Sequence, residues 1–146
     1  MSEERPDDGD DHASFYPAEY LEGIALFNSR RFYEAHDAWE SLWLREPDAR
    51  RKLLLQALIQ SAIAFYHLEE GRKRGARKMY ERAKEKFARL KEKRLMSLDV
   101  ESFERQFDAV LKNELLIGDE REATNVDKVA SMPRIVLLPP QEEDFK

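Results

Sequence analysis

The chain reads LLLQALIQSAIAFYHL at residues 53–68, which is its longest stretch without a charged residue. A membrane-spanning helix needs about 20 consecutive, predominantly apolar residues. This stretch is shorter than that and contains the polar side chains of Gln56, Gln60 and His67. A helix that is apolar nearly all round is expected where other helices cover it on several sides. We therefore predict a buried central helix at residues 48–70 and no membrane span.

Four further helices are predicted around the central one, because apolar residues recur at intervals of three and four in each of these segments. The segments are residues 17–30, residues 32–45, residues 72–94 and a last helix that begins at Asp99. Gly71 lies where a glycine often ends a helix, in the left-handed conformation that follows the last turn. The predicted fold class is all-α, a compact bundle of about five helices.

The two ends of the chain differ from the helical segment between them. Residues 1–14 hold six acids and one base, a composition typical of a flexible acidic tail. The pattern past Gly118 is not helical, and the apolar residues 135–138 lie between prolines, which favours an extended strap that packs on the domain. With 146 residues the chain can bury one hydrophobic core. We therefore predict a single domain at residues 15–118, with tails at residues 1–14 and 119–146.

The composition excludes several classes of site and indicates a cellular location. No cysteine is present, so disulfides, thiolate metal sites and thiol nucleophiles are excluded. The acidic N-terminal segment lacks the apolar stretch of a secretory signal. We expect a cytoplasmic protein that does not associate with membranes.

Polar side chains lie among aromatic ones in the segment FYEAHDAWESLW, residues 32–43. Helical periodicity puts the histidine, the second glutamate and both tryptophans of this segment on one face. The central helix carries two glutamines and a histidine on one stripe in the same way. If the two faces meet, as those of antiparallel neighbours do, the core contains a polar cluster. The residues of this candidate polar pocket are Glu34, His36, Glu40, Trp43, Gln56, Gln60 and His67.

Two interpretations of this cluster are open. A closed network of histidine, glutamate and glutamine satisfies buried polar groups, each of which costs about 1 to 3 kcal/mol when left unpaired, and so fixes the register of the helices. Alternatively, His36, Glu40 and His67 surround a cavity that binds a small ligand or a metal ion, or that hydrolyses a substrate. We favour the structural network. We predict no cofactor and no metal site, because these three residues make a metal site only if the helices bring them together.

Residues 72–94 form the most basic segment, with twelve lysines and arginines against three glutamates. Its basic residues lie on the helix face opposite the apolar one, where they are candidates for binding an anion or a nucleic acid. These candidates are Arg74, Arg77, Lys78, Arg82 and Lys86. No Gly-rich phosphate loop or nucleic-acid recognition motif accompanies them. We therefore favour a solvated face and do not expect nucleic acid as a partner.

A set of spaced motifs runs through the helical segment. The motifs are Phe27-Asn28, Phe32-Tyr33-Glu34-Ala35-His36, Glu40, Trp43, Leu58-Ile59-Gln60, Ala62, Ala64, His67, Gly71 and Gly75-Ala76. Together they resemble the family numbered 309 of domains of unknown function, which are small helical proteins of bacteria and archaea. The resemblance covers residues 21–90 and implies a compact helical bundle but no activity. The positions that it marks for testing are Glu34, His36, Glu40, Trp43, Gln60 and His67.

Two departures from the family pattern bear on the shape of the domain. The family commonly has a glycine where Arg30 stands and an aliphatic residue where Trp39 stands. Because a glycine eases a tight turn, we expect a turn of different shape at Arg30. The bulk of Trp39 is expected to lie next to the candidate pocket and to fill it.

The sequence alone identifies no activity. It contains no serine elbow, phosphate loop or Cys–His arrangement, so catalytic residues are not assigned. We expect a non-enzymatic interaction or structural domain that binds a protein partner or a second copy of itself. The alternatives are a small-ligand-binding or metal-binding protein or a hydrolase that uses the histidines, and an anion or nucleic-acid binder that uses residues 72–94.

Overall fold

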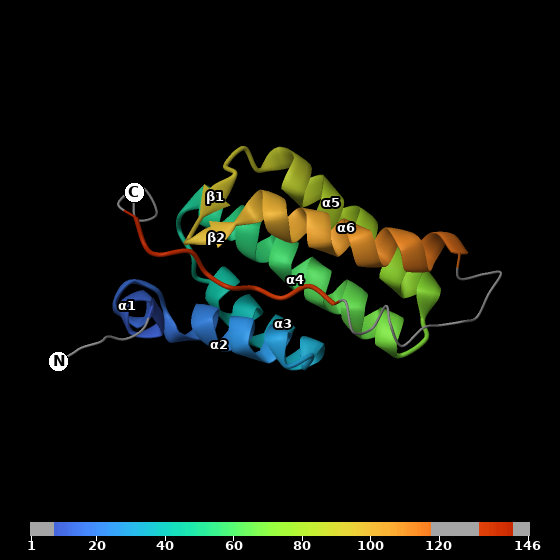
Figure 1. Ribbon diagram of the computed structural model, residues 1–146, viewed down its shortest axis with the longest axis horizontal. Helices are drawn as coiled ribbons and strands as arrows, with labels where there is room; N and C mark the ends of the chain where they lie inside the picture. Colours follow the sequence, from blue (N-terminus) through green and yellow to red (C-terminus); the bar gives the residue numbers. More distant parts are fainter. Residues whose placement is uncertain (1–7, 118–131, 142–146) are drawn as a thin grey trace.

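Six α-helices and one short β-hairpin make up the part of the chain that the computed structural model describes, residues 8–117 and 132–141. The elements are α1 (Asp8–Phe15), α2 (Ala18–Asn28), α3 (Phe32–Trp43), α4 (Ala49–Glu69), α5 (Lys73–Arg89), β1 (Arg94–Leu95), β2 (Leu98–Asp99) and α6 (Val100–Ile117). In Figure 1, α4 lies between α5 and α6 on one side and α2 and α3 on the other. The prediction of an all-α bundle is confirmed.

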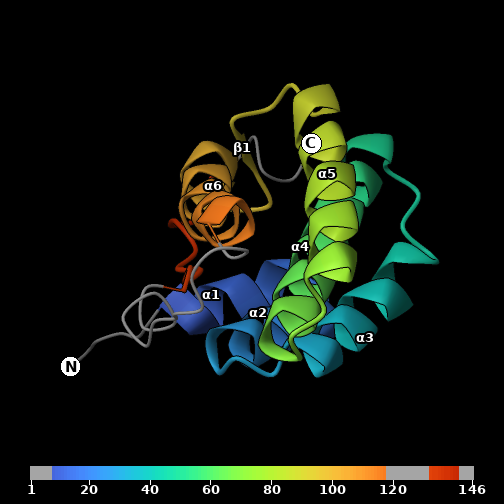
Figure 2. The same cartoon turned by 90° about the vertical axis from the view of Figure 1, so that its right-hand side faces the viewer.

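The central helix is α4, as the sequence predicts. It begins after Asp48, whose carboxylate oxygen Oδ1 accepts hydrogen bonds from the backbone N–H groups of Arg50 and Arg51 at 2.9 and 3.1 Å. Its fully buried residues cover about half of its circumference, because α3 packs against α4 and α5 packs against it as well. In the view of Figure 2, α5 lies in front of α4, and α3 lies to the lower right of both. None of the helices within the described residues is long and apolar enough to cross a membrane.

A chain of phenylalanine rings joins four of the helices in the core. Phe27 of α2 lies 5.2 Å from Phe32 of α3, and Phe32 lies 5.3 Å from Phe65 of α4, measured between ring centroids. Phe65 in turn contacts Phe107 of α6 at 5.6 Å. Phe103 of α6 closes the cluster against Phe27 at 5.7 Å. Tilted and edge-on ring pairs at these distances add to the stabilisation that comes from burial alone.

Trp39 of α3 determines how closely α2 approaches α3. Its indole is fully buried and its Nε1–H donates a hydrogen bond to the carbonyl oxygen of Tyr20 at 3.2 Å. A Cβ atom placed on Gly23 would lie only 2.2 Å from that same Nε1. The indole ring therefore occupies the space that the side chain of any residue other than glycine would need at position 23. Trp39 fills the core between the two helices.

The turn between α2 and α3 keeps a glycine-like conformation at Arg30. The φ angle of Arg30 is 64°, in the left-handed region, which costs a non-glycine residue about 1 to 2 kcal/mol. Arg30 thus adopts the backbone conformation that favours glycine, and the expectation of a turn shaped differently from that of the family stays a prediction. The Arg30 guanidinium reaches Glu69 at the end of α4, at 2.7 Å. The predicted left-handed end of α4 is confirmed by Gly71, whose φ is 79°.

The basic helix ends earlier than predicted. Residues 72–94 were expected to form one helix, whereas α5 ends at Arg89 and the chain then turns through the β1–β2 hairpin. Met96 and Ser97 at its tip have φ angles of 53° and 62°, the paired left-handed conformation of a tight hairpin turn. The chain leaves the helix at Leu90, whose backbone is extended and whose side chain is buried, and Met96 and Ser97 are fully buried as well. Asp99 then caps α6, as predicted, by accepting the Ser102 N–H at 3.0 Å.

The N-terminal segment is ordered further than its composition suggests. Residues 1–14 were expected to be a flexible tail, but the described part of this segment forms α1 from Asp8 onward. His12 is only 3% exposed, and its Nε2 lies 2.8 Å from the carbonyl oxygen of Leu138. Contact with a segment far away in the sequence explains this order, because an acidic helix of eight residues is not stable alone.

The described part of the C-terminal tail, residues 132–141, is extended and packs along the bundle, as predicted (Figure 1). The side-chain amide of Asn28 pairs with the backbone of Ile135 through two hydrogen bonds of 2.8 Å. Leu138 donates its N–H to the carbonyl oxygen of Ser97 at 2.7 Å. Residues 119–131 and 142–146 of the predicted tail lie outside the described residues.

We predict that Gly23→Ala lowers the free energy of unfolding by about 1 to 3 kcal/mol, the usual cost of added volume in a packed core. Urea titration followed by circular dichroism measures the change. Gly75→Ala in α5 is the matched control, because the atoms nearest to a Cβ there belong to the partly exposed ring of His67, at 3.0 Å, and not to a buried indole at 2.2 Å. A similar loss of stability in both variants would contradict this account of the α2–α3 contact.

Candidate functional site

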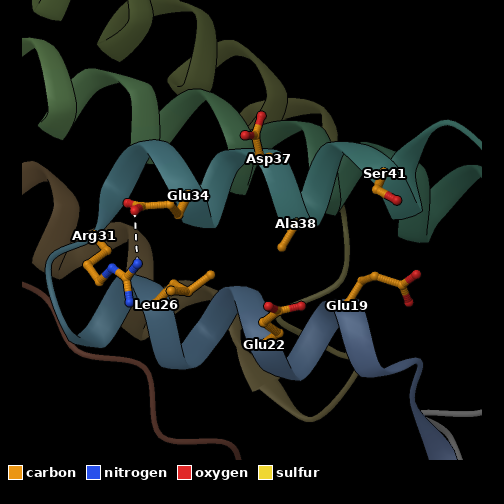
Figure 3. Close-up of a pocket in the computed structure, with 8 residues that line it drawn as sticks. All are labelled: Glu19, Glu22, Leu26, Arg31, Glu34, Asp37, Ala38 and Ser41. Carbon is orange, nitrogen blue, oxygen red and sulfur yellow. Dashed lines mark hydrogen bonds and ion pairs between the residues drawn. The ribbon is translucent and has the colours of Figure 1, made fainter.

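An open groove of about 470 Å³ runs between α2 and α3. Figure 3 shows Leu26 and Ala38 in the groove between acidic side chains that the two helices contribute. The lining residues are Glu19, Glu22, Leu26, Arg31, Glu34, Asp37, Ala38 and Ser41. The two helices touch on their core-facing side, at Gly23 and Trp39, and the groove lies on their solvent-facing side. Of the residues predicted as a pocket, only Glu34 lines it.

The groove carries more acidic than basic charge. Arg31 pairs with Glu34 at 3.0 Å, and Arg45 pairs with Glu19 at 2.8 Å. A backbone hydrogen bond and then the Arg45 guanidinium lower the pKa of Glu19. Within the described residues no lysine or arginine lies within ion-pair distance of Glu22 or Asp37. Two of the four carboxylates are therefore balanced and two are not.

His36 lies beside the groove and belongs to a small cluster of potential ligands. Its side chain is 15% exposed, and its Nε2 lies 3.4 Å from Oε1 of Glu40. Its Nδ1 lies 3.0 Å from the carbonyl oxygen of Tyr33 and 3.6 Å from Oδ1 of Asp37. One ligand atom from each of His36, Asp37 and Glu40 lies within 4.8 Å of the others. Three side chains of a single helix thus converge.

His67 belongs to a different cluster near the end of α4. Arg72 donates from Nε to Nδ1 of His67 at 3.1 Å, and its guanidinium stacks over Tyr66 at 5.3 Å. Burial, and secondly the charge of Arg72, lower the pKa of His67. The rings of Tyr33 and Tyr66, 5.2 Å apart, lie between this cluster and His36. The two histidines are therefore not neighbours.

The predicted buried network across α3 and α4 is wrong. Within residues 8–117 no hydrogen bond or ion pair connects His36 or Glu40 with the polar side chains of α4. The Glu40 side chain is 48% exposed. The reason is the rotation of α3, which turns its buried residues toward the core and leaves the histidine and the glutamate at the rim. Those buried residues are Phe32, Ala35, Trp39 and Leu42.

The remaining residues of the predicted pocket are scattered. Gln56 is partly buried in α4, and the side-chain oxygen of Gln60 is buried without a hydrogen-bond partner. Trp43 ends α3, where Lys52 lies over its ring at 4.2 Å and bonds its carbonyl oxygen at 2.7 Å. The three residues named in the sequence analysis as possible metal ligands, His36, Glu40 and His67, are likewise not brought together. Asp37 stands in the place of His67, and the sequence reasoning missed it.

The five residues of α5 that were predicted to bind an anion are not all available to a ligand. Arg77 donates to the carbonyl oxygen of Leu115 at the end of α6, at 3.2 Å. Lys86 is buried and bonds Glu85 at 3.0 Å. Arg74, Lys78 and Arg82 remain exposed. Two of the five thus serve contacts within the bundle.

Residues 20–79 match the family model described as a domain of unknown function (DUF309). The resemblance to DUF309 is confirmed. The uncharacterized protein YpuF of Bacillus subtilis (strain 168) is 31% identical over 65 residues, which cover 44% of this chain and 37% of the relative. The DUF309 match runs from α2 into α5 and includes Glu22, His36, Glu40 and His67. The groove and both histidine clusters thus lie mainly or wholly in the matched segment, for which neither description names an activity.

We predict that His67 makes the folded protein sensitive to mild acid. Because the pKa of His67 is lowered on folding, the unfolded chain binds more protons below a pH of about 6.5. The contribution of neutral His67 to the free energy of unfolding is complete above that pH and is lost as the pH falls below it. Urea unfolding at pH 7.5 and pH 5.5 should show a smaller loss for His67→Gln than for the parent protein.

Arg72→Gln provides the comparison for this pH dependence. It removes the second cause of the lowered pKa and leaves the first, burial, in place. Its pH dependence should therefore fall between those of the parent and His67→Gln. Identical pH profiles for the parent and His67→Gln would overturn the assignment.

Proposed function

We propose that this domain is a non-enzymatic interaction module that binds a basic segment of a partner protein in the groove between α2 and α3. The observation that carries the proposal is the groove's composition. Leu26 and Ala38 provide an apolar floor, and the uncompensated carboxylates of Glu22 and Asp37 lie on the two opposite helices. A segment with apolar residues on one side and lysine or arginine at its edges complements both features.

The size of the groove fits a short segment. On α3 its lining runs from Glu34 to Ser41 and on α2 from Glu19 to Leu26. Each of these stretches is about two helical turns, or roughly 10 Å long. A partner segment of about two to three turns would contact the full length. Most of the groove lies within residues 20–79, so the proposal applies to the part of the chain that DUF309 describes.

Electrostatic attraction would dominate the encounter. The groove is open to solvent, so each charge pair is screened and contributes at most about 1 kcal/mol. Several such pairs together still accelerate association and select against acidic partners. We further infer a cytoplasmic location, which a chain without cysteine suits because it needs no oxidising compartment to fold.

We predict that the full chain binds a synthetic amphipathic helical peptide of leucine and lysine, measured by fluorescence anisotropy. The affinity should fall as salt is raised from 50 to 300 mM, because screening weakens exposed charge pairs. Glu22→Lys should raise the Kd at least about fivefold, since it replaces an attractive contact with a repulsive one. Glu81→Lys, an exposed position on α5 outside the groove, should leave the Kd unchanged.

Binding that is equal in both variants, or that does not change with salt, would sink the proposal. A peptide of the same pattern with glutamate in place of lysine controls for apolar adhesion and should not bind. If the protein itself forms a salt-sensitive oligomer that Glu22→Lys dissociates, the basic partner is a second copy of this chain.

A further inference from the structure

His36, Asp37 and Glu40 combine the side chains that bind divalent transition metals. One imidazole nitrogen and two carboxylate oxygens lie within 4.8 Å of one another. All three belong to α3, where Glu40 lies four residues after His36 and three after Asp37, the two intervals that bring side chains together on a helix surface. Imidazole with carboxylate is a donor set that suits Zn²⁺ and its neighbours, whereas Mg²⁺ and Ca²⁺ prefer oxygen alone.

The backbone holds the His36 ring in one orientation. A carbonyl oxygen can only accept, so the Nδ1 atom that lies 3.0 Å from the Tyr33 oxygen must carry a hydrogen. The ring also packs against that of Tyr33, with 5.0 Å between centroids. Metal-binding histidines are commonly fixed in this way, by donating the second ring N–H to a carbonyl or carboxylate.

This orientation brings two acceptors face to face. With the hydrogen on Nδ1, the Nε2 atom of a neutral His36 ring presents a lone pair, and Oε1 of Glu40 lies 3.4 Å away. Two lone pairs at this separation repel unless a proton or a metal ion lies between them. In a tetrahedral site with bonds of about 2.1 Å, neighbouring ligand atoms are about 3.4 Å apart. The separation of the histidine and glutamate atoms therefore matches the edge of such a site.

The charge around the cluster favours a cation. Within the described residues the only ion-pair contact of Asp37 and of Glu40 is with His36 itself. Asp37 also lines the acidic groove, which contains the uncompensated Glu22. From these observations we propose that His36, Asp37 and Glu40 bind one Zn²⁺-like divalent ion, with water completing its coordination. The proposal does not depend on the groove's binding a basic partner.

The affinity should be moderate because the two carboxylates are solvated. The side chain of Asp37 is 62% exposed and that of Glu40 is 48% exposed. Binding would fix both side chains at bonding distance of a shared ion. Ordering two mobile side chains opposes binding. The partly buried His36 ring needs no such ordering and should supply the selectivity for transition metals.

The test is a titration of the chelator-treated full chain with Co²⁺ and with Zn²⁺, followed by visible absorption and by isothermal titration calorimetry. We expect one ion per chain. His36→Gln and Glu40→Gln should each raise the Kd at least about tenfold, and Asp37→Asn should raise it less. His67→Gln is the matched control, since it removes a histidine outside the cluster and should leave the Kd unchanged. Circular dichroism confirms that each variant is folded.

Three results would overturn the proposal. The first is no binding at 1 mM metal, which would leave the contact between His36 and Glu40 as an interaction within the helix alone. The second is unchanged affinity in both Glu40→Gln and Asp37→Asn, which would mean that neither carboxylate is a ligand. The third is a loss of binding in His67→Gln equal to that in His36→Gln. Glu22→Lys separates this site from the groove, because it should weaken peptide binding while one metal ion still binds.

Discussion

The contact between Trp39 and Gly23 is the constraint on which the site depends. The indole occupies the space of a missing side chain and donates to the carbonyl oxygen of Tyr20, so it fixes both the distance between α2 and α3 and their rotation. Once the core-facing side of α3 is fixed, the directions of its other residues follow from helical geometry. One flank faces α2 and forms the acidic groove. The other presents His36 and Glu40 at the rim.

The polar residues of α3 thus have different roles from those that their spacing alone suggests. Glu34 and His36 are two residues apart in the sequence but face different sides of the helix. The first lines the groove, where Arg31 balances its charge, and the second approaches Glu40. Separating these roles explains how one short helix can contribute both a docking surface and a metal-ligating cluster. Asp37 lies in both, so the two proposals are tested separately through Glu22, which lies in the groove alone, and through His36 and Glu40, which lie in the cluster alone.

Long-range contacts also order the ends of the bundle. α1 and the β1–β2 hairpin meet the extended residues 132–141, which supply backbone partners for His12 and for Ser97. Tyr16 adds a bond of 2.7 Å to the Ser97 hydroxyl. Segments near both ends of the chain therefore cover one side of the helical bundle. The α2–α3 groove is not among these contacts and keeps its opening to solvent.

The sequence by itself determined the helical class, the central position of α4 and several helix ends, because periodicity and capping are local properties. Asp48, Gly71 and Asp99 act at the positions where the sequence placed them. The sequence did not predict the buried turn at residues 96–97, the order of α1 or the place of His36. Whether a residue at the edge of an apolar stripe is buried depends on which helix covers that edge. Only the tertiary structure decides this, through contacts such as that of Trp39 with Gly23.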